Sequence, residues 1–192
     1  MTRELIGIGG KYAAGKDVVA NFYKTQLGFV TLGFSDILNE MLLKLDPFVM
    51  KEASGHDLLR YSQVVKAQGY VKAKTNPEVR RLLQVFGTEI GRQMIHVDIW
   101  TDLTAERITK YNDAGKSVVV TGVRYPNEVD MIRRLGGETL WIHRPDQGDT
   151  GDHTSENSVS EDDFDHLIVN DAGIAELENK AGELYMRLFT DD

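Results

Sequence analysis

Seven residues near the start of the chain have types and a spacing suited to binding phosphate. Gly10-Lys11-Tyr12-Ala13-Ala14-Gly15-Lys16 fits the pattern G-x-x-x-x-G-K and lies between an apolar run and a helix-like segment. In that setting, successive backbone N–H groups form a concave anion site at the positive end of the helix. Lys16 adds a full charge for the β- and γ-phosphates. The pattern predicts an ATP-binding loop; the alternative is a glycine-rich turn with a chance lysine.

The two residues after the lysine depart from the usual pattern. Asp17 and Val18 stand there, so the hydroxyl group that normally contacts Mg²⁺ is missing. Mg²⁺ prefers oxygen ligands and keeps several waters, which makes Asp17 the candidate metal ligand, directly or through water. The alternative for Asp17 is an acidic residue that the helix dipole favours in the first turn.

A second candidate site lies on the segment from Pro77 to Met94, which is predicted to be one helix. At about 100° per residue, one side of this helix carries polar side chains and two glycines: Arg80, Arg81, Gln84, Gly87, Thr88, Gly91 and Arg92. A glycine inside a helix is less favourable than alanine by about 1 kcal/mol, so we expect a ligand or another backbone to approach closely there. We predict that this face binds an acceptor phosphate; the alternative is a solvated outer face.

A further arginine follows the buried strand predicted at Ser117 to Val120. Arg124 comes shortly after that strand, where ligands of a parallel sheet bind. The alternative for Arg124 is a loop arginine that caps a nearby carbonyl. A nucleoside monophosphate presents an ionised phosphate as nucleophile, because its second pKa is about 6, so its phosphorylation needs no general base. Charge neutralisation and positioning suffice.

The elements that must position these residues alternate along the chain. Strands are predicted at Leu5–Ile8, Phe29–Phe34, Ser117–Val120, Thr139–His143 and His166–Val169. Helices are predicted at Lys16–Leu27, from Ser35 to about Leu45, at His56–Lys74 with a break near Gly69, and at Pro77–Met94, Asp98–Tyr111, Pro126–Leu135 and Ile174–Phe189. This alternation predicts an α/β fold, a three-layer sandwich with a mainly parallel sheet. We expect one domain over 1–192, with an acceptor-binding helical region at about 35–112 and a lid loop at about 145–163.

Composition narrows the class of protein. The chain has 192 residues, 41% hydrophobic and 27% charged, no cysteine and a net charge of −8. These values are typical of a globular protein and exclude thiol chemistry. The negative charge argues against a general nucleic-acid binder, although a few converging arginines hold a small anion whatever the net charge. No apolar run approaches about 20 residues, and the N-terminus has no signal-peptide pattern, so we expect no membrane partner and a cytoplasmic location.

Six motifs together resemble the deoxynucleoside monophosphate kinases of bacterial viruses, within the P-loop nucleotide kinase family. The resemblance covers nearly the whole chain and is weakest at about 43–76. The motifs are Gly15-Lys16-Asp17, Phe34-Ser35-Asp36, Val79 to Glu89, Val123 to Glu128, His153-Thr154-Ser155-Glu156 and Val169-Asn170-Asp171. Two positions depart from the family pattern: Val18 replaces a Thr or Ser, and Gly122 stands where members often have Asp.

The resemblance implies ATP as donor, Mg²⁺ as cofactor, a deoxynucleotide acceptor and, in many members, a homodimer. It also implies host cytoplasm as the location of a viral member. Ser35 and Asp36 would then open the acceptor-side helix, Glu156 would belong to the lid, and Asn170 and Asp171 would lie near the donor base.

Three other readings stay open at this point. The first is a kinase of another phosphorylated acceptor, since phosphomevalonate kinase of the animal type shares the G-K-D loop and dephospho-coenzyme A kinase has a similar architecture. The second is a nucleotide-binding regulatory protein without transferase activity. The third is a slow hydrolase. All of them, like the kinase, bind small nucleotides rather than nucleic acid.

Overall fold

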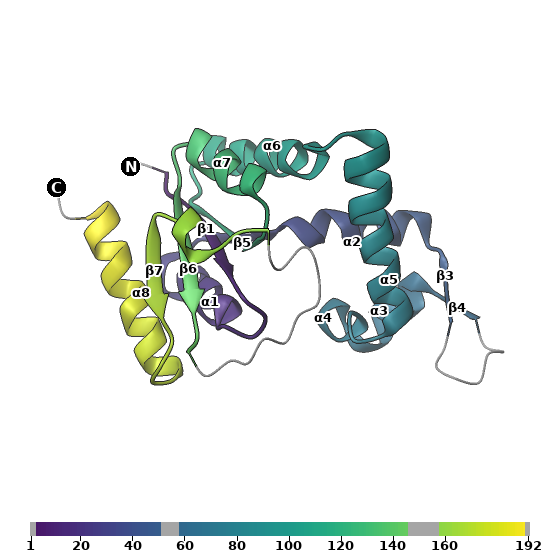
Figure 1. Cartoon of the computed structure of the whole chain (residues 1–192), viewed down its shortest axis with the longest axis horizontal. Coiled ribbons are helices and arrows are strands. Elements are labelled where there is room, and N and C mark those ends of the chain that lie inside the picture. The colour runs from purple at the N-terminus through teal and green to yellow at the C-terminus, as the bar shows by residue number, and fades with distance from the viewer. Residues whose placement is uncertain (1–2, 51–57, 146–157, 191–192) are drawn as a thin grey trace. The chain divides into compact units, whose positions relative to one another are not determined.

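The computed structural model describes residues 3–50, 58–145 and 158–190, and it divides the chain into two units. The first, here called the sheet unit, comprises Met1–Phe34 and Thr104–Asp192. The second, the helical unit, comprises Ser35–Leu103. Figure 1 labels the elements of both. Within the described ranges, no helix combines the length and the apolar character that crossing a bilayer requires.

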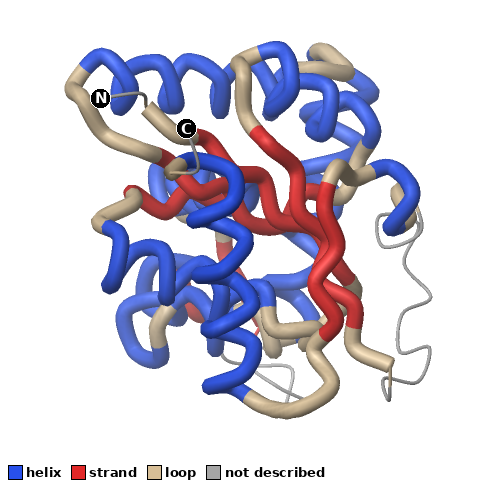
Figure 2. Tube along the Cα trace, turned by 90° about the vertical axis from the view of Figure 1, so that its left-hand side faces the viewer, coloured by secondary structure: helices blue, strands red, loops and turns tan. Residues whose placement is uncertain are grey.

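A five-stranded parallel sheet forms the centre of the sheet unit, as predicted. Its strands are β1 (Leu5–Gly10), β2 (Val30–Gly33), β5 (Val118–Val123), β6 (Glu138–His143) and β7 (His166–Val169), in the order β2-β5-β1-β6-β7. All four neighbouring pairs are parallel. Figure 2 shows these strands running side by side between helices. The carboxyl ends of all five strands therefore lie along one edge of the sheet, where ligands of such sheets bind.

Helices cover both faces of this sheet and make it a three-layer sandwich. The helices are α1 (Lys16–Leu27), α7 (Pro126–Arg134) and α8 (Ile174–Phe189), while α6 (Ile99–Asp113) runs from the helical unit into the sheet unit. Ile6 and Ile8 of β1 share a buried cluster with Tyr23 of α1 and Leu177 of α8. Gly7 faces the other way, where a Cβ would lie 2.9 Å from Ile132 of α7. This alternation along β1 places α1 and α8 on one face and α7 on the other.

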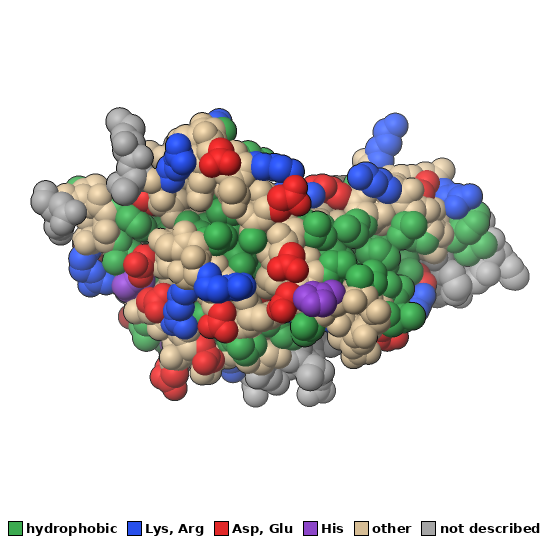
Figure 3. All heavy atoms as spheres, turned by 90° about the horizontal axis from the view of Figure 1, so that it is seen from above, with side chains coloured by type: hydrophobic (Ala, Val, Ile, Leu, Met, Phe, Trp, Pro, Cys, Tyr) green, Lys and Arg blue, Asp and Glu red, His purple; other side chains and the backbone are tan. Residues whose placement is uncertain are grey.

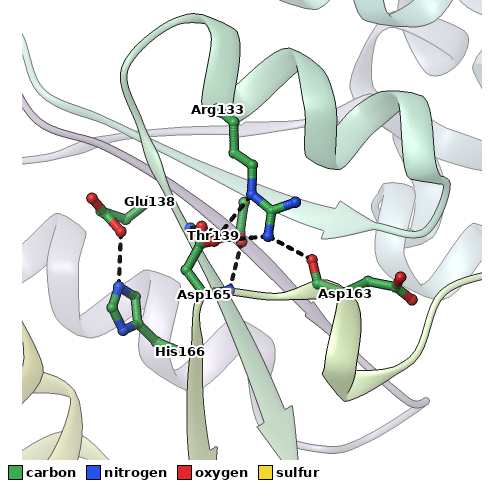
Figure 4. A network of polar contacts seen from close by, with 6 residues as sticks. All are labelled: Arg133, Glu138, Thr139, Asp163, Asp165 and His166. Atoms are coloured by element: carbon green, nitrogen blue, oxygen red, sulfur yellow. Dashed lines mark hydrogen bonds and ion pairs between the residues drawn. The ribbon is translucent and has the colours of Figure 1, made fainter.

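The polar network of Figure 4 joins α7 to the start of β6 and to the segment that leads into β7. Asp165 accepts hydrogen bonds from Arg133 Nε (3.0 Å) and Nη2 (2.7 Å), and from Thr139 N (3.0 Å) and Oγ1 (2.7 Å). Burial opposes ionisation of Asp165, but these hydrogen bonds outweigh it and hold the pKa of the carboxyl below its usual value. Glu138 pairs with His166 beside them at 2.8 Å. The network ties the strands together at the edge of the sheet opposite the predicted loop.

The helical unit contains α2 (Phe34–Leu45), which begins in the sheet unit, α3 (Tyr61–Gln68), α4 (Tyr70–Ala73), α5 (Pro77–Gln84) and η1 (Val85–Ile95). Its buried cluster includes Leu42, Tyr61, Val64 and Val79. The break predicted near Gly69 separates α3 from α4. Residues 58–60, which were predicted to be helical, instead form β4 (Leu58–Arg60), which pairs antiparallel with β3 (Phe48–Met50), and α3 begins at Tyr61. Arg60 lies 3.9 Å from the centre of the Phe48 ring across that pair.

The helix predicted from Pro77 to Met94 is correct in extent and wrong in geometry beyond Gln84. Asn76 caps its start, where Oδ1 accepts from the N–H groups of Glu78 at 2.9 Å and Val79 at 3.3 Å. From Val85 to Ile95 the chain is a π-helix, with wider turns than an α-helix. A wheel drawn at 100° per residue therefore loses its register in this segment, and it places Gly87 and Gly91, which are buried, on the polar side.

The surface carries both signs of charge. On the face shown in Figure 3, Lys and Arg side chains are interspersed with Asp and Glu, with hydrophobic side chains between them. The 310 turn η3 (Glu161–Asp163) is an acidic surface segment, in which Asp163 Oδ2 accepts from the backbone N–H of Ser160 at 2.7 Å.

Candidate active site

The predicted phosphate loop connects the end of β1 to the start of α1 (Figure 1). Its backbone is left-handed at Gly10 (φ 137°), Ala13 (φ 54°) and Gly15 (φ 109°). Gly10 is required for its positive φ and also for lack of space, because a Cβ on Gly10 would lie 2.5 Å from the carbonyl oxygen of Ile142 in β6. Ala13 adopts its conformation as an exposed alanine, which is uncommon outside functional turns.

Lys16 lies folded across this loop. Its Nζ donates to the carbonyl oxygen of Gly10 at 2.7 Å and to that of Lys11 at 2.5 Å. Both acceptors belong to the loop itself, so the ammonium group is held over the same residues whose backbone forms the predicted anion site. Tyr12, the residue after Lys11, is 61% exposed.

Few side chains at this loop could serve as ligands of a metal ion. Asp17 is exposed in the first turn of α1, whereas Val18 is partly buried and packs against the hydrophobic cluster of the sheet unit. Among the described residues, no group of three or more His, Asp or Glu side chains is arranged to bind a metal. One carboxylate fits Mg²⁺ only when phosphate oxygens and waters complete the octahedron, and that is how this ion is usually held beside nucleotides.

The backbone explains why no carboxylate stands at Gly122. Ile8 pairs with Thr121 and Gly9 with Val123, so Gly122 is an extra residue that forms a bulge in β5. Its φ of 75° is in the left-handed region, which glycine adopts without steric cost and other residues adopt with strain. The bulge therefore disfavours a side chain at the position where family members often have Asp.

Arg124 follows the bulge, and a buried carboxylate fixes its backbone. Glu128 is 2% exposed, and its Oε2 accepts from the N–H groups of Arg124 at 2.7 Å and Tyr125 at 3.3 Å. The side chain of Arg124 is exposed. Glu128 thus fixes the start of α7 and the point from which Arg124 projects. This role of Glu128 was not predicted from the motif Val123 to Glu128, although the i to i+3 spacing of a capping box indicates it.

Asn170 and Asp171 follow β7 at the same edge of the sheet. The side chain of Asn170 donates to the carbonyl oxygen of Ala14 in the loop at 2.9 Å. Asp171 pairs with Lys180 at 2.7 Å, and this hydrogen bond lowers the pKa of Asp171. The structure therefore brings the loop, Arg124 and Asn170 to the carboxyl ends of β1, β5 and β7.

Ser35 and Asp36 lie in the first turn of α2, where two residues missed by sequence analysis contact Ser35. Tyr70 Oη donates to the Ser35 carbonyl oxygen at 2.8 Å, and Lys74 Nζ donates to Ser35 Oγ at 3.1 Å. The Lys74 ammonium also lies 4.0 Å from the centre of the Tyr70 ring. Burial raises the pKa of the Tyr70 hydroxyl, so it remains a donor at neutral pH. No sequence spacing connects residues 35 with 70 and 74, which explains why they were missed.

The arginine-bearing helix exposes most of the polar side chains that the prediction places on one side. Arg80, Gln84 and Thr88 are exposed. Arg81 is exposed too and makes two hydrogen bonds to Glu78, at 2.8 and 2.7 Å, which raise the pKa of Arg81 and lower that of Glu78. Arg92 is half-buried, with Nη1 3.3 Å from the carbonyl oxygen of Val97.

The prediction that a ligand or another backbone approaches Gly87 and Gly91 is corrected by the packing of both glycines. Both are buried. A Cβ on Gly91 would lie 2.3 Å from Trp100 Cζ2, and one on Gly87 would lie 3.3 Å from Leu38 Cδ1. Trp100 Nε1 also donates to the Gly87 carbonyl oxygen at 2.7 Å. Core side chains of the helical unit make the close approach, the Trp100 indole at Gly91 and Leu38 at Gly87.

One predicted segment is outside the described residues. Glu156, with the rest of His153 to Glu156, lies there, as does most of the predicted lid at 145–163. The lid and the role of Glu156 therefore stay predictions.

Comparison with known proteins identifies relatives by sequence and by fold. A family model described as deoxynucleotide monophosphate kinase matches residues 33–181. The deoxynucleoside-5'-monophosphate kinase of Escherichia phage T5 is 35% identical over 98 residues, which are 47% of this chain and 38% of that protein. A protein of Acanthamoeba polyphaga mimivirus, provisionally named a deoxynucleotide monophosphate kinase, is 28% identical over 90% of this chain and 91% of its own length.

Solved structures of P-loop kinases share the fold. A dephospho-CoA kinase from Campylobacter jejuni aligns with a TM-score of 0.51 at 14% identity, over 96% of this chain and 97% of that one. The APS kinase of Mycobacterium tuberculosis, solved with AMPPNP and APS, aligns with a TM-score of 0.54 at 12% identity, over 95% and 96%. At such identities the likeness shows the architecture alone.

Proposed function

The chain belongs to the deoxynucleotide monophosphate kinase family, and from that membership we propose that it phosphorylates deoxynucleoside monophosphates with ATP as the donor. An oxygen of the acceptor phosphate forms a bond to the γ-phosphorus of ATP. The bond from that phosphorus to the β,γ-bridging oxygen breaks, and the products are ADP and a deoxynucleoside diphosphate. The observation that carries the proposal is the phosphate loop, in which Lys16 Nζ donates to the carbonyl oxygens of Gly10 and Lys11. The same chain matches the family model over residues 33–181.

In this proposal the loop binds the phosphates of ATP, and no general base is needed. The acceptor phosphate is already ionised at neutral pH, since its second pKa is about 6. Catalysis then consists of alignment and of neutralising charge on the transferring group. Loop amides and Lys16 supply that charge on the donor side. Arg124, held through its backbone by Glu128, supplies a guanidinium group at the end of β5.

Asp17 would hold Mg²⁺ together with phosphate oxygens and waters. When bound, that ion neutralises charge on the β- and γ-phosphates. Val18 offers no hydroxyl ligand and Gly122 no carboxylate, so Asp17 is the one residue of this set with a charged oxygen.

The acceptor is proposed to bind residues of the helical unit. Ser35 and Asp36 open α2, and exposed Arg80, Gln84 and Thr88 line the helix that follows Asn76. Arg81 would exchange its carboxylate partner Glu78 for the acceptor phosphate, which offers the same bidentate geometry with more charge. The resemblance also implies a homodimer, which light scattering of the purified protein tests.

A coupled ADP-release assay tests the reaction. Purified protein with Mg·ATP is given dTMP, dGMP, dCMP, dAMP, the ribonucleotides, phosphomevalonate or no acceptor. We expect release that depends on one or more deoxynucleoside monophosphates. Release with phosphomevalonate alone would replace the substrate, and release without any acceptor would indicate a hydrolase. Bound ATP with no release in any arm would favour the regulatory reading.

The variant Lys16→Met tests the role of Lys16, with Lys24→Met as its matched control. We expect it to abolish deoxynucleotide-dependent ADP release while the circular dichroism spectrum stays unchanged, because the charge at the transferring phosphate is lost but no core packing is. Lys24→Met, which removes an exposed lysine from the last turn of the same helix, should keep wild-type activity. Wild-type activity in Lys16→Met would refute the phosphate-loop assignment.

A further inference from the structure

We infer that Asn170 is a positioning residue, which holds the phosphate loop in its anion-binding shape through the carbonyl group of Ala14. This inference deepens the proposed function and rests on its assignment of the loop. The family resemblance places Asn170 near the donor base, whereas its side-chain amide here has a partner in the loop itself.

Asn170 connects three segments that lie far apart in the sequence. It directly follows β7, and its backbone N–H donates to the carbonyl oxygen of His143, at the end of β6, at 2.7 Å. Its Nδ2 donates to the carbonyl oxygen of Ala14, between β1 and α1, at 2.9 Å. The backbone bond fixes where the side chain starts, and the side-chain bond fixes one peptide group of the loop.

That peptide group joins Ala14 to Gly15, and its orientation decides which polar group faces an anion. In a planar trans peptide the carbonyl and the next N–H point in opposite directions. Because the Ala14 carbonyl points to Asn170, the Gly15 N–H points away from Asn170. A flip of this peptide would exchange the two, replacing a donor with a carbonyl oxygen that repels phosphate.

The loop is prone to such a flip, and its packing favours one orientation. Ala13 and Gly15, on either side of Ala14, both have positive φ, and glycine passes easily between backbone regions. Ala14 itself is fully buried, and Gly15 leaves no room for a side chain, since a Cβ would lie 2.9 Å from Asn170 Nδ2 and 2.7 Å from Leu177 Cδ2. Within the described part of the chain, the hydrogen bond from Asn170 to the Ala14 carbonyl oxygen distinguishes the two peptide orientations.

The turn that carries Asn170 has its own anchor, which offers a control. Lys180 Nζ donates to the carbonyl oxygen of Val169 at 2.9 Å and to Asp171 Oδ1 at 2.7 Å. Lys180→Met removes hydrogen bonds from the residues on either side of Asn170 and leaves Asn170 in place. It therefore weakens the turn without removing the bond to Ala14.

The test is calorimetric binding of Mg²⁺ complexes of inorganic tripolyphosphate, ATP and GTP. Tripolyphosphate contains the phosphates but no base. For Asn170→Ala we expect the affinities for tripolyphosphate and ATP to fall by the same factor, about 3- to 10-fold as for the loss of one hydrogen bond, with the ATP:GTP preference unchanged. Lys180→Met should lower the thermal midpoint and leave the tripolyphosphate affinity at the wild-type value.

Two results would overturn the inference. A fall in ATP affinity with unchanged tripolyphosphate affinity would make Asn170 a contact of the base, and unchanged affinities for both would leave it no part in binding. Asn170→Ser, a smaller perturbation, answers the same question if the alanine variant does not fold. Failure of this inference is distinguishable from failure of the proposed function. If the wild-type protein binds tripolyphosphate through Lys16 but does not phosphorylate deoxynucleotides, the binding test of Asn170 still gives a result.

Discussion

Replacement of Gly91 by alanine tests the packing of η1 against Trp100. The new Cβ would lie 2.3 Å from Cζ2, 2.8 Å from Cε2 and 2.9 Å from Nε1 of the indole. The ring has little room to retreat, because Trp100 is 3% exposed and Nε1 donates to the Gly87 carbonyl oxygen. The substitution must therefore shift either the ring or the helix.

The sign of the effect follows from three contributions. Alanine is better than glycine inside a helix by about 1 kcal/mol. Overpacking a buried site costs about 1–3 kcal/mol, and breaking the bond to Gly87 leaves buried groups unpaired at a further cost of about 1–3 kcal/mol. Even the low ends of these costs exceed the gain, so we expect Gly91→Ala to destabilise the helical unit by at least about 1 kcal/mol.

Gly182→Ala in α8 is the matched control. It is also a glycine inside a helix, but its Cβ would meet only the end of the Phe22 ring, with Cζ at 3.3 Å and Cε1 at 3.8 Å. The end of that ring needs to move by a few tenths of an ångström, so we expect unchanged stability or a gain of up to about 1 kcal/mol.

Urea denaturation followed by tryptophan fluorescence measures both variants. The chain has two tryptophans, Trp100 in the helical unit and Trp141 in the sheet unit. In a Trp141→Phe background, the signal reports the surroundings of Trp100. A Gly91→Ala midpoint equal to or above that of its parent would refute the packing argument.

Two further predictions concern ion pairs. Asp165→Asn should lower the free energy of unfolding at pH 7 by about 1–2 kcal/mol, because hydrogen bonds to a partly exposed carboxylate are lost. The pKa of Asp165 is lowered in the folded state, so its contribution to stability is present above the unfolded pKa of 3.8 and is lost as pH falls through the folded pKa. If Asp165→Asn and wild type still differ in urea midpoint below the folded pKa, ionised Asp165 is not the source of the difference. Arg81→Ala should raise the KM for the deoxynucleotide about 10-fold and leave the KM for ATP unchanged. Glu78→Gln, which releases Arg81, should not raise either constant, and unchanged constants in Arg81→Ala would show that Arg81 is solvated surface.

Local sequence determined most element boundaries. Helix α1 ends at Leu27 because Gly28 takes the left-handed conformation that terminates it, with φ 74°. The break between α3 and α4 falls at Gly69 for a related reason, a φ of 79°. Buried apolar runs also predicted the five parallel strands, because strands covered on both faces need apolar side chains throughout.

Elements whose geometry depends on distant partners were not predictable in this way. The β3–β4 pair has only three residues in each strand, too few for a periodic pattern. Gly91 packs against Trp100 and Gly87 against Leu38, and both partners lie outside the helix on which the wheel is drawn. Helical periodicity describes each helix alone, so the sequence did not reveal that the indole of Trp100 fills the space beside Gly91.

The same division applies to the candidate site. Glycines and a lysine at fixed spacing specify the phosphate loop, because backbone conformation and helix polarity are local properties. The contacts of Asn170 with Ala14, of Lys74 with Ser35 and of Trp100 with Gly91 were decided by the tertiary structure. They depend on strand order and on how helices pack, and these bring together side chains that sequence spacing leaves unrelated.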